Sequence, residues 1–586
     1  MGSGQRKKPD KFTIVNELAR RRGFFWRSCE IYGGVSGFVT YGSLGTRLKQ
    51  NIENKLRELF LNKLGILEIE SSVITPSKVF EASGHIGHFK EPMVECLKCN
   101  RRFRADQLLE ESMEKGSSET EKLGLKDLGN AIAKHGVRCP ECGGTLSKPK
   151  YFPTMFKTTI GPYSEAVGYG RPEAAQGIFV EFRRLYELAR ERLPFGVLQI
   201  GHALRNEISP RQGLIRLREF TIMDVEFFFD PEEPKCLLLK DVEDEKLRLV
   251  LAKNRLKGSE RAVEVTVKEA LRKAYIRADW QAVFMAFAKR LLITLGVSHE
   301  KQRFIEKLPW EQAHYALQSF DQEVHLERWG WTEVSGHAYR TNYDLKQHMQ
   351  FSGVDMQIYK EYEQPVEREK IVLKPIMSRL GPDFKDEATT VADMLSNVDA
   401  KAVETSIEKR GYYTLGKYRI VPQHVGITHK KVEERGKRFI PHVVEPSFGS
   451  DRLVYVALEH AYRVKDDRAL LSFPRDIAPV QVGVYPLVSK DGLAEKSLQV
   501  YKTLLVEGFV AEYDEAGSIG RRYARADEAG TPLGVTIDYE TLKNETVTIR
   551  DRDSWKQVRS KIKDLPKLLS KYFTYKADFK DLGKPI

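Results

Sequence analysis

Apolar residues recur with a helical period between Leu44 and Leu64, at positions 44, 48, 52, 56, 59, 60 and 64, and charged residues occupy the opposite face. This pattern predicts an amphipathic helix that ends at Gly65. The run that follows, ILEIESSVITP, predicts a strand that ends at Pro76. A further helix is predicted at residues 179–192, before the helix-breaking Pro194.

Two β-rich runs, GVLQIGHAL and FTIMDVEFFFD, predict antiparallel strands joined by the polar loop around NEISPRQG. From about residue 235, Lys, Glu, Arg and Leu dominate and Gly is sparse, which predicts a helical insertion. Residues 351–440 predict a second, mixed insertion without strong periodicity. After a break at residues 471–486, strand and helix patterns alternate to the end of the sequence. They predict an α/β domain with a small mixed sheet and flanking helices.

The composition narrows the class of protein. Of 586 residues, 41% are apolar and 30% charged, which excludes a mainly disordered chain. No apolar run approaches the roughly 18 residues of a membrane-spanning helix, and no internal repeat indicates a solenoid or propeller. The first residues, MGSGQRKKPDK, lack a following apolar stretch, so we expect no secretory signal and a cytoplasmic protein. The net charge of +13 favours a polyanionic partner, although a heavily solvated surface has the same composition.

Four of the six cysteines form two C-x2-C pairs, in ECLKCN and RCPECGG, with 39 residues between the pairs. Four thiolates in this pattern favour a tetrahedral, structural zinc ion held by Cys96, Cys99, Cys139 and Cys142. The segment between the pairs must then carry an internal helix, for which LKDLGNAIAKHG is the candidate. The alternative is four unrelated buried cysteines. His85 and His88, in GHIGHF, are candidates for a metal role or for lining a ligand pocket.

The run QIGHALRNEISPRQGLIRLREF places Arg205 at the end of a strand, Arg211, Arg216 and Arg218 in a loop, and Phe220 at the start of the next strand. An arginine on a rigid strand can clamp a phosphate, loop arginines can close over a polyphosphate, and an aromatic ring can stack on a base. The alternative is a basic hairpin on a solvated face.

A second anion site is predicted in VVEPSFGSDRLVYVALEHAY, where a strand and a Gly-containing turn precede a helix. The N-terminus of that helix favours an anion. Arg452, in its first turn, adds a positive charge and a flat surface for stacking.

These motifs resemble those of the class II, homodimeric glycyl-tRNA synthetases of archaea and the eukaryotic cytoplasm. The helix and strand of residues 44–76 resemble motif 1 of that family, RNEISPRQGLIRLREF resembles motif 2, and EPSFGSDRL resembles motif 3. GRPEAAQGIF is similar to the amino-acid-binding loop, WGWTEVSGHAYRTNYDL to another family block, and GSIGRRYARADEAGTPLGVTID to a stretch of the anticodon domain. The match is collinear over nearly the whole chain and misses only the two insertions.

The resemblance implies an α+β fold, in which a class II synthetase antiparallel-sheet catalytic core carries zinc-bearing and helical insertions and a C-terminal α/β anticodon-binding domain. The expected parts are residues 1–90 (N-terminal segment and motif 1 of the core), 91–150 (zinc-binding insertion), 151–234 (core with motif 2), 235–330 (helical insertion), 331–350 (core block), 351–440 (second insertion), 441–471 (core motif 3) and 472–586 (anticodon-binding domain).

The activity that the resemblance implies is that of a glycine–tRNA ligase, which activates glycine with ATP to glycyl-adenylate and transfers it to the 3′ end of tRNA(Gly). It also implies Mg²⁺, zinc and a homodimer without membrane association. Glycine is the smallest amino acid, so steric exclusion selects it without an editing domain. Two alternatives stay open: a class II synthetase of other specificity, and a synthetase-like RNA-binding paralogue that does not charge tRNA.

The resemblance assigns roles to individual residues. Arg205 would hold the α-phosphate, Glu207 would read the adenine amino group or the tRNA end, and Arg452 would enclose the adenine with Phe220. These three, Arg205, Glu207 and Arg452, are the implied catalytic residues. The implied ATP-binding set is Arg205, Asn206, Glu207, Ile215, Arg216, Arg218, Glu219, Phe220, Glu333, Val334, Gly449 and Arg452. The implied glycine-binding set is Arg104, Glu173, Phe220, Asp224, Glu445, Ser447 and Gly449. Glu333 and Glu445 are the candidate magnesium carboxylates.

Two positions depart from the family pattern. Ala174 stands where the family has Thr, which removes a hydroxyl. Asp224 stands where the family has a glutamate facing the glycine α-carbon, which shortens the carboxylate by one methylene. Either Asp224 or the longer Glu226, on the same strand face, is then the acid that contacts glycine. The alternative for Asp224 is a simple pair with a neighbouring arginine such as Arg218.

Overall fold

The structure is a computed structural model that describes residues 9–113, 120, 123–162, 165–210, 212–234 and 236–586. The first eight residues, where we expect no secretory signal, and Arg211 of the predicted phosphate loop lie outside the described residues. The chain divides into two compact units, Met1–Met356 with Pro441–Ile586, and Gln357–Ile440. Among the described residues, no helix is long and apolar enough to cross a membrane.

A nine-stranded sheet forms the centre of the first unit, in the order β13-β12-β14-β15-β16-β21-β11-β10-β3. Its strands are β3 (Leu67–Ile69), β10 (Phe195–Leu204), β11 (Glu219–Phe229), β12 (Lys246–Val250), β13 (Val263–Thr266), β14 (Gln302–Glu306), β15 (Gln318–Leu326), β16 (Gly330–Thr341) and β21 (His442–Gly449). Neighbouring strands are antiparallel except in the pairs β12–β14 and β10–β3. The predicted antiparallel-sheet core, and the predicted pairing of β10 with β11, are confirmed.

Three helices cover one face of this sheet: α2 (Ser43–Leu64), α11 (Asp279–Thr294) and α16 (Ser450–Ala461). The predicted apolar stripe of α2 is buried against the core, and Gly65 ends the helix with a φ of 61°. The ring of Phe60 on α2 lies 5.7 Å from the rings of Phe284 on α11 and Phe448 on β21. Aromatic contacts of this kind join the helices to the sheet.

Strand β11 faces the core on one side and a cavity on the other, because its residues alternate between the two faces of the sheet. Met223, Val225 and Phe227 belong to the core beneath the helices. Phe220 and Ile222 lie on the other face, where they line a cavity. One face of the strand therefore contributes to stability and the other presents side chains for chemistry.

Two secondary-structure predictions in the core are corrected. The single strand predicted to end at Pro76 is two strands, β3 and β4 (Ile74–Pro76), which belong to different sheets. The helix predicted at residues 179–192 is α7 (Ala175–Val180) followed by α8 (Phe182–Leu188). Positive φ angles at Arg190 and Glu191 turn the chain before Pro194, so the helical pattern ends earlier than its apolar residues indicate.

The helical insertion predicted for residues 235–330 is wrong in its secondary structure. Strands β12, β13, β14 and β15 of this segment extend the central sheet, and its helices are α9 (Ala252–Arg255), α10 (Val267–Arg272) and α11. The strand runs KLRLV and VEVT are five and four residues long. Within a sequence rich in Lys, Glu and Leu, alternation over so few residues is a weaker signal than composition.

Residues 90–153 form a small module with its own sheet, β6-β5-β7. The strands are β5 (Lys90–Glu95), β6 (Arg102–Arg104) and β7 (Lys150–Pro153), and the helices are α5 (Ala105–Ser112) and α6 (Leu125–Lys134). Helix α6 confirms the helix predicted between the cysteine pairs, and its Leu128 and Ile132 enter a local apolar core. A neighbouring three-stranded sheet contains β4, β8 (Phe156–Thr159) and β9 (Val167–Gly170).

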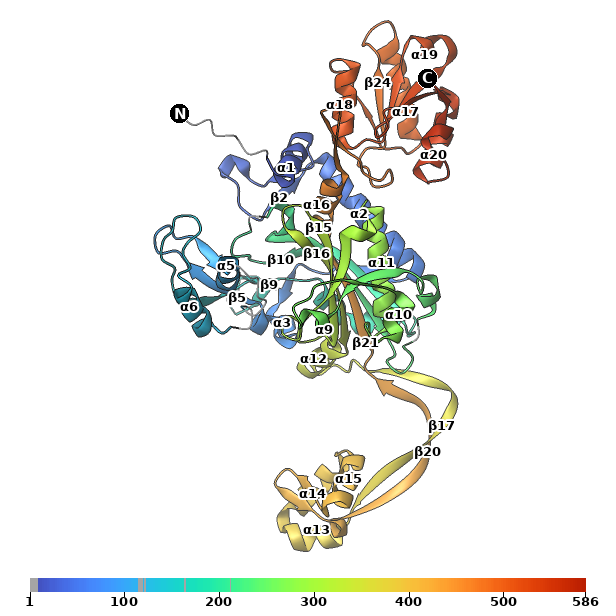
Figure 1. Cartoon of the computed structure of the whole chain (residues 1–586). Coiled ribbons are helices and arrows are strands. Elements are labelled where there is room, and N and C mark those ends of the chain that lie inside the picture. The colour runs from blue at the N-terminus through green and yellow to red at the C-terminus, as the bar shows by residue number, and fades with distance from the viewer. Residues whose placement is uncertain (1–8, 114–119, 121–122, 163–164, 211, 235) are drawn as a thin grey trace. The chain divides into compact units, whose positions relative to one another are not determined.

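The second unit, Gln357–Ile440, consists of a long two-stranded ribbon and a small helical body. The ribbon pairs β17 (Ile358–Pro375) with β20 (Val425–Phe439), as Figure 1 shows. The body contains α13 (Met377–Phe384), α14 (Ala388–Ser396), α15 (Ala400–Arg410), β18 (Tyr413–Leu415) and β19 (Tyr418–Ile420). Leu380, Val391 and Val403 form the centre of its separate apolar core.

The C-terminal part confirms the predicted α/β domain. Its six-stranded sheet has the order β25-β24-β26-β27-β28-β29, with parallel pairs at β24–β25 and β24–β26 and antiparallel pairs in the rest. The strands are β24 (Val482–Pro486), β25 (Ala511–Tyr513), β26 (Leu533–Ile537), β27 (Thr546–Asp551), β28 (Gln557–Lys561) and β29 (Lys584–Pro585). The helices are α17 (Leu493–Val506), α18 (Ile519–Ala529), α19 (Tyr539–Asn544) and α20 (Leu565–Phe573).

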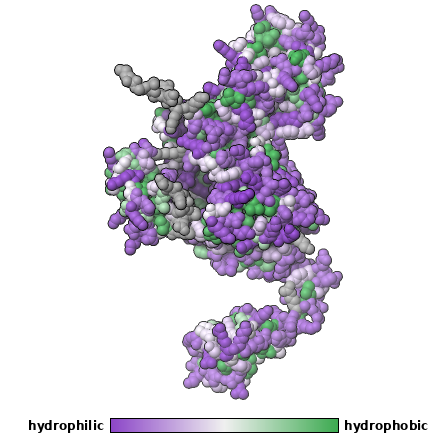
Figure 2. All heavy atoms as spheres, viewed as in Figure 1, coloured by the Kyte–Doolittle hydropathy of each residue, from purple (hydrophilic) through white to green (hydrophobic). Residues whose placement is uncertain are grey.

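The remaining elements surround the core: α1 (Lys11–Arg22), β1 (Phe25–Arg27), β2 (Val39–Tyr41), α3 (Ser77–Ala82), α4 (His85–His88), α12 (Tyr343–Ser352), β22 (Tyr462–Lys465) and β23 (Arg468–Leu471). In the view of Figure 2 the surface is mainly hydrophilic, and apolar residues form small scattered groups. That distribution agrees with the high charge of the sequence.

Candidate active site

A cavity of about 320 Å³ lies on the face of the central sheet opposite the covering helices, and we call it the central cavity. Its lining brings together residues from the chain before α7, from the β10–β11 loop, and from β11, β15, β16, β21 and α16. The predicted site residues that line it are Glu173, Arg205, Glu207, Ile215, Arg216, Phe220, Glu333, Val334, Glu445, Ser447, Gly449 and Arg452. The size is within the range of sites for small-molecule ligands.

One end of the central cavity is rich in arginine and aromatic side chains. The guanidinium of Arg205 lies 5.3 Å from the ring centroid of Phe220 and 5.7 Å from that of Phe89. Its Nε donates a hydrogen bond of 3.0 Å to the carbonyl of Pro172. Because Nε is engaged and two aromatic rings lie against the guanidinium, the outer nitrogens of Arg205 are held in position to meet an anion.

Arg452 closes the same end from helix α16. Its Nε donates to the carbonyl of Ile215 at 3.0 Å, and a terminal nitrogen donates to the carbonyl of Glu333 at 2.8 Å. The Glu333 carboxylate lies 3.4 Å from Arg452. Burial by itself raises the pKa of Glu333, but Arg452 and Lys307 lower it below its ordinary value, so this carboxylate is ionised.

Two further lining residues of this end were not identified from the sequence. Lys307 lies 2.5 Å from the carboxylate of Asp321, and both side chains line the central cavity beside Glu333. Burial, and then the charge of Glu333, raises the pKa of Asp321 to about 7. Asp321 lies on β15 in the segment that was predicted to be a helical insertion, so no pattern in the sequence placed it opposite β16.

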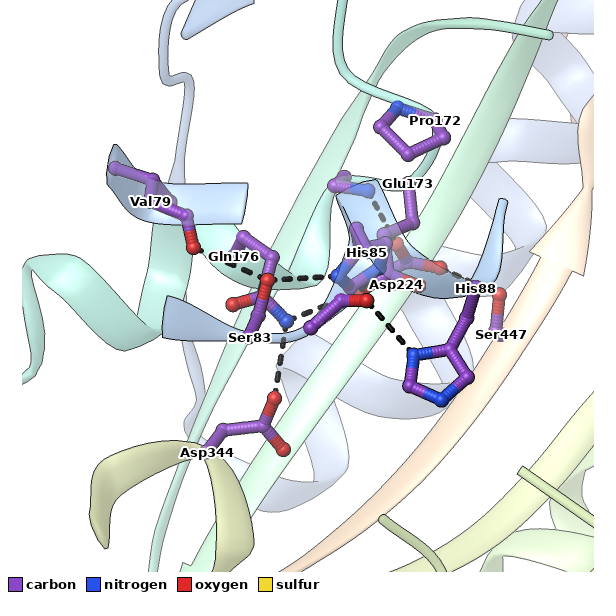
Figure 3. A network of polar contacts seen from close by, with 12 residues as sticks. Val79, Ser83, His85, His88, Pro172, Glu173, Gln176, Asp224, Asp344 and Ser447 are labelled. Atoms are coloured by element: carbon purple, nitrogen blue, oxygen red, sulfur yellow. Dashed lines mark hydrogen bonds and ion pairs between the residues drawn. The ribbon is translucent and has the colours of Figure 1, made fainter. Parts of the chain in front are cut away.

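The other end of the central cavity is acidic, and Figure 3 shows part of its polar network. Glu173 accepts a hydrogen bond of 3.1 Å from Gln176, and its carboxylate lies 3.1 Å from His85 Nε2 and 3.8 Å from Arg340. Burial favours a raised pKa for Glu173, but the facing His85 and Arg340 lower it well below its ordinary range. Glu173 is therefore a buried anion that is already paired.

Asp224 lies behind the cavity wall and is fully buried. It accepts a hydrogen bond of 2.5 Å from the Ser447 hydroxyl (Figure 3). It accepts a second one of 2.8 Å from the Ala174 amide. Arg218 instead donates to the carbonyls of Glu207 and Ser36, so the structure contradicts a pair between Asp224 and Arg218. Burial raises the pKa of Asp224 above its ordinary value.

Arg340 is the positively charged group at the centre of the acidic end, and it was not among the predicted site residues. It is fully buried, binds Asp344 through two hydrogen bonds of 2.9 Å, and donates to Glu445 at 2.9 Å. The ring of Tyr315 lies 3.8 Å from the guanidinium carbon. The spacing of Arg340 and Asp344, four positions apart within GHAYRTNYDL, was the feature of the sequence that could have predicted this ion pair.

Five predicted residues do not line the central cavity. Asp224 lies behind its wall, as described above. Arg104 lies in the small module and pairs with Glu91 and Asp106, so it does not reach the acidic end of the cavity. Asn206 bonds through its backbone to Thr154, and Arg218 supports the loop carbonyls. Glu219 faces a different hollow, where it lies 3.3 Å from His202.

The two histidines of GHIGHF have different environments. His85 is buried, lies 2.7 Å from the Ser83 hydroxyl through Nδ1, and faces Glu173. His88 is bonded to the carbonyl of Gly84 and stacks on His314 at 4.4 Å. Among the described residues, the four-cysteine cluster is the only group of three or more ligand-type side chains close enough to hold a metal, and neither histidine belongs to it.

The four predicted zinc ligands converge in the small module. Their sulfur atoms all lie within 4.8 Å of one another, with 3.5 Å between Cys96 and Cys142 and 3.7 Å between Cys99 and Cys139. Thiolates at about 2.3 Å around a tetrahedral zinc ion are about 3.8 Å apart, so the residues fit this metal. A Cβ on Gly144 would lie 2.8 Å from the Cys96 sulfur. The backbone amides of Cys99 and Lys98 lower the pKa of Cys96 to about 6, which favours a thiolate.

Comparison with known proteins gives a consistent set of relatives. A family model described as an anticodon binding domain matches residues 481–572. A protein of Thermococcus kodakarensis named glycine–tRNA ligase is 46% identical over 568 residues, 96% of this chain and 98% of that protein. Proteins of the same name from Aeropyrum pernix and Methanocaldococcus jannaschii are 45% identical over 582 residues, with coverages of 98% and 99%, and 43% identical over 567 residues, with coverages of 95% and 98%.

Solved structures show the fold. A prolyl-tRNA synthetase from Cryptosporidium parvum, complexed with halofuginone and AMPPNP, has a TM-score of 0.51 at 13% identity, over 97% of this chain and 80% of that chain. Prolyl-tRNA synthetase from Giardia lamblia, in complex with prolyl-adenylate, also has a TM-score of 0.51 at 13% identity, with coverages of 95% and 75%. The sheet and C-terminal domain of this chain therefore have the class II synthetase arrangement.

Proposed function

We propose that this chain, which belongs to the glycine–tRNA ligase family, activates glycine with ATP and transfers the glycyl group to the 3′ end of its tRNA. The observation that carries the proposal is the composition of the central cavity. An arginine-rich aromatic end suited to a nucleotide adjoins an acidic end suited to a small ammonium group.

The acidic end accounts for selection of glycine. Ser447 lines the cavity, and Asp224 accepts its hydroxyl hydrogen bond from behind, so Ser447 forms a rigid wall where a side chain on the α-carbon would have to lie. Glu173 and Glu445 line the space and supply negative charge for the glycine ammonium. A larger amino acid meets steric exclusion, and an uncharged amine loses the electrostatic interaction.

At the arginine-rich end, adenine lies between Phe220 and Arg452, and Arg205 meets the α-phosphate. Attack of the glycine carboxylate on that phosphorus releases pyrophosphate. Charge on the phosphoryl oxygens grows in the transition state, and the fixed guanidinium of Arg205 stabilises it without reorganisation. Arg216, which also lines the cavity, neutralises the outer phosphates.

The magnesium assignment differs from the sequence-based one. Glu445 is bound to Arg340, which suits a glycine-side role better than a metal-ligand role. Glu333 and Asp321 line the arginine-rich end together, and carboxylates of this kind suit a magnesium ion that arrives with ATP. Such an ion supplies positive charge to the β- and γ-phosphates. Lys307 lies beside Asp321 and holds that carboxylate in place.

The proposal extends to the other parts of the chain. The C-terminal domain contacts the anticodon of tRNA(Gly), in keeping with the family model that matches it. The four cysteines hold a structural zinc ion, and the chain acts as a cytoplasmic homodimer, as the family resemblance implies. Sedimentation of the purified protein at assay concentration tests the dimer directly.

ATP–pyrophosphate exchange, followed by charging of a tRNA(Gly) transcript, tests the function. We expect exchange with glycine but not with alanine, serine or proline, and loss of exchange in Arg205→Ala. Exchange with another amino acid alone would identify a synthetase of different specificity. A folded protein that binds tRNA and shows no exchange with any amino acid would be a non-charging paralogue.

A further inference from the structure

One buried carboxylic acid next to the central cavity has no hydrogen-bond partner among the described residues. Glu226 lies on β11, two residues after Asp224 and on the same face of the sheet, and its exposed fraction is 0%. Among the described residues, neither of its carboxylate oxygens has a hydrogen-bond partner. Glu173, Asp224, Asp344 and Glu445 all have one. An ionised carboxylate in such a place would lose hydration without compensation.

The strand register places Glu226 next to a second acid. Asp224 pairs with Ser447 and Phe227 with Val444, so Glu226 stands opposite Glu445 across β11 and β21. Side chains opposite each other in antiparallel strands lie on one face with their Cβ atoms about 5 Å apart. Two carboxylates this close in a buried site do not both ionise. Glu445 lines the central cavity and Glu226 does not, so Glu226 stands behind Glu445.

The surrounding charges indicate which acid holds the proton. The charged groups that face Glu226 are Asp224 from β11, Glu445 from β21, Arg340 from β16 and Asp344 from α12, while β10 presents Val197 in register. Arg340 donates to Glu445 and Asp344 but makes no hydrogen bond to Glu226. Burial, and then the charge of Glu445, raises the pKa of Glu226 well above its ordinary value. Burial also raises the pKa of Glu445, but the facing Arg340 limits the rise to about 7, so the proton belongs on Glu226.

We propose that Glu226 is a positioning residue for the amino-acid end of the cavity: as a neutral carboxylic acid it donates a hydrogen bond to the Glu445 carboxylate and fixes it for the substrate ammonium. Glu445 then has two supports, Arg340 on one oxygen and Glu226 behind it. No bond to substrate is made by Glu226 itself. This inference rests on the proposed function, because Glu445 faces a glycine ammonium only if glycine is the substrate.

Two variants separate this role from simple space filling. Glu226→Gln keeps the shape and an N–H donor without a titratable proton, whereas Glu226→Leu keeps the volume and removes the donor. We expect Glu226→Leu to raise the KM for glycine in pyrophosphate exchange by roughly 10- to 100-fold, the value of one hydrogen bond to a charged group. Glu226→Gln should stay within about threefold of the unmodified protein, and the KM for ATP should not change in either.

A double-mutant cycle tests whether Glu226 acts through Glu445. In a Glu445→Gln background, Glu226→Leu should have little further effect on the glycine KM, because the carboxylate that Glu226 supports is gone. Equal effects of Leu and Gln in the unmodified background would overturn the proposal. If both are harmless, Glu226 only fills space, and if both are equally harmful, an ionised carboxylate is required.

Infrared difference spectroscopy tests the neutral state without relying on activity. The spectrum of the full chain minus that of Glu226→Gln should contain the carbonyl stretch of a protonated carboxylic acid. Absence of that band in two folded proteins with matching thermal transitions would refute the proposal. Failure of the unmodified chain to show glycine-dependent exchange would instead refute the proposed function, and the infrared band would still report the state of Glu226.

Discussion

Replacing Asp224 by alanine removes the acceptor that joins Ser447 to the Ala174 amide at the acidic end of the cavity. Asp224 binds the Ser447 hydroxyl at 2.5 Å and the Ala174 amide at 2.8 Å, and all of it is buried. The hydroxyl can rotate toward another acceptor, but the backbone amide is fixed by the chain. In Asp224→Ala that amide is left without a partner, and the loop that carries Glu173 loses its anchor.

The size of the effect follows from this geometry. A buried donor without a partner costs about 1–3 kcal/mol, which corresponds to roughly a 5- to 150-fold change if the cost falls on the glycine-bound state. Removal of the carboxylate also opens space beside the α-carbon. Exclusion of a single methyl group is worth only about 1–3 kcal/mol, so a cavity of this size admits alanine.

Pyrophosphate exchange with glycine and with alanine measures both effects. We expect Asp224→Ala to raise the KM for glycine by roughly 10- to 100-fold, to leave the KM for ATP unchanged, and to activate alanine measurably. Asp224→Asn is the matched control, since it keeps the volume and one acceptor. It should have a smaller effect on the glycine KM and should continue to exclude alanine.

Normal glycine kinetics without alanine activation in Asp224→Ala would refute the role of Asp224 in holding the pocket wall. The Ser447 hydroxyl and the loop before α7, which carries Glu173, would then have to be held by other groups. A parallel rise in the KM for ATP would indicate general damage to the sheet rather than a local effect. A thermal melt of each variant distinguishes that case, because β11 also contributes Met223 and Phe227 to the core.

Other predictions address separate parts of the molecule. Cys96→Ser should abolish tightly held zinc, and Gly144→Ala should weaken it because the added Cβ would lie 2.8 Å from the Cys96 sulfur. Metal analysis after dialysis checks both, and a full equivalent of zinc in Cys96→Ser would contradict the site. A chain that ends before Ser472 should still make glycyl-adenylate but charge tRNA poorly, with circular dichroism as the control for folding. Unchanged charging would show that the C-terminal domain does not read tRNA. Arg452→Ala should raise the KM for ATP by roughly 10- to 100-fold and spare glycine, because its guanidinium orders the arginine-rich end only. Equal changes for both substrates would contradict that division.

Local patterns in the sequence determined several features without any knowledge of the fold. The helical period of residues 44–64 predicted α2 because a 3.6-residue repeat requires only its own segment. The two C-x2-C pairs predicted a metal centre because each pair sits on one turn. The strand end at Arg205 and the helix start at Arg452 likewise predicted anion contacts from neighbouring residues alone.

Tertiary structure decided which distant residues share an environment. Glu226 and Glu445 are 219 positions apart, and only the pairing of β11 with β21 makes them neighbours. The same holds for Arg340, whose three acidic partners come from the chain before α7, from α12 and from β21. Charged composition led to the wrong prediction for residues 235–330, because a short strand is stabilised by neighbours in the sheet rather than by its own sequence. Burial and strand register, which are properties of the folded chain, therefore set the charge of the acidic end.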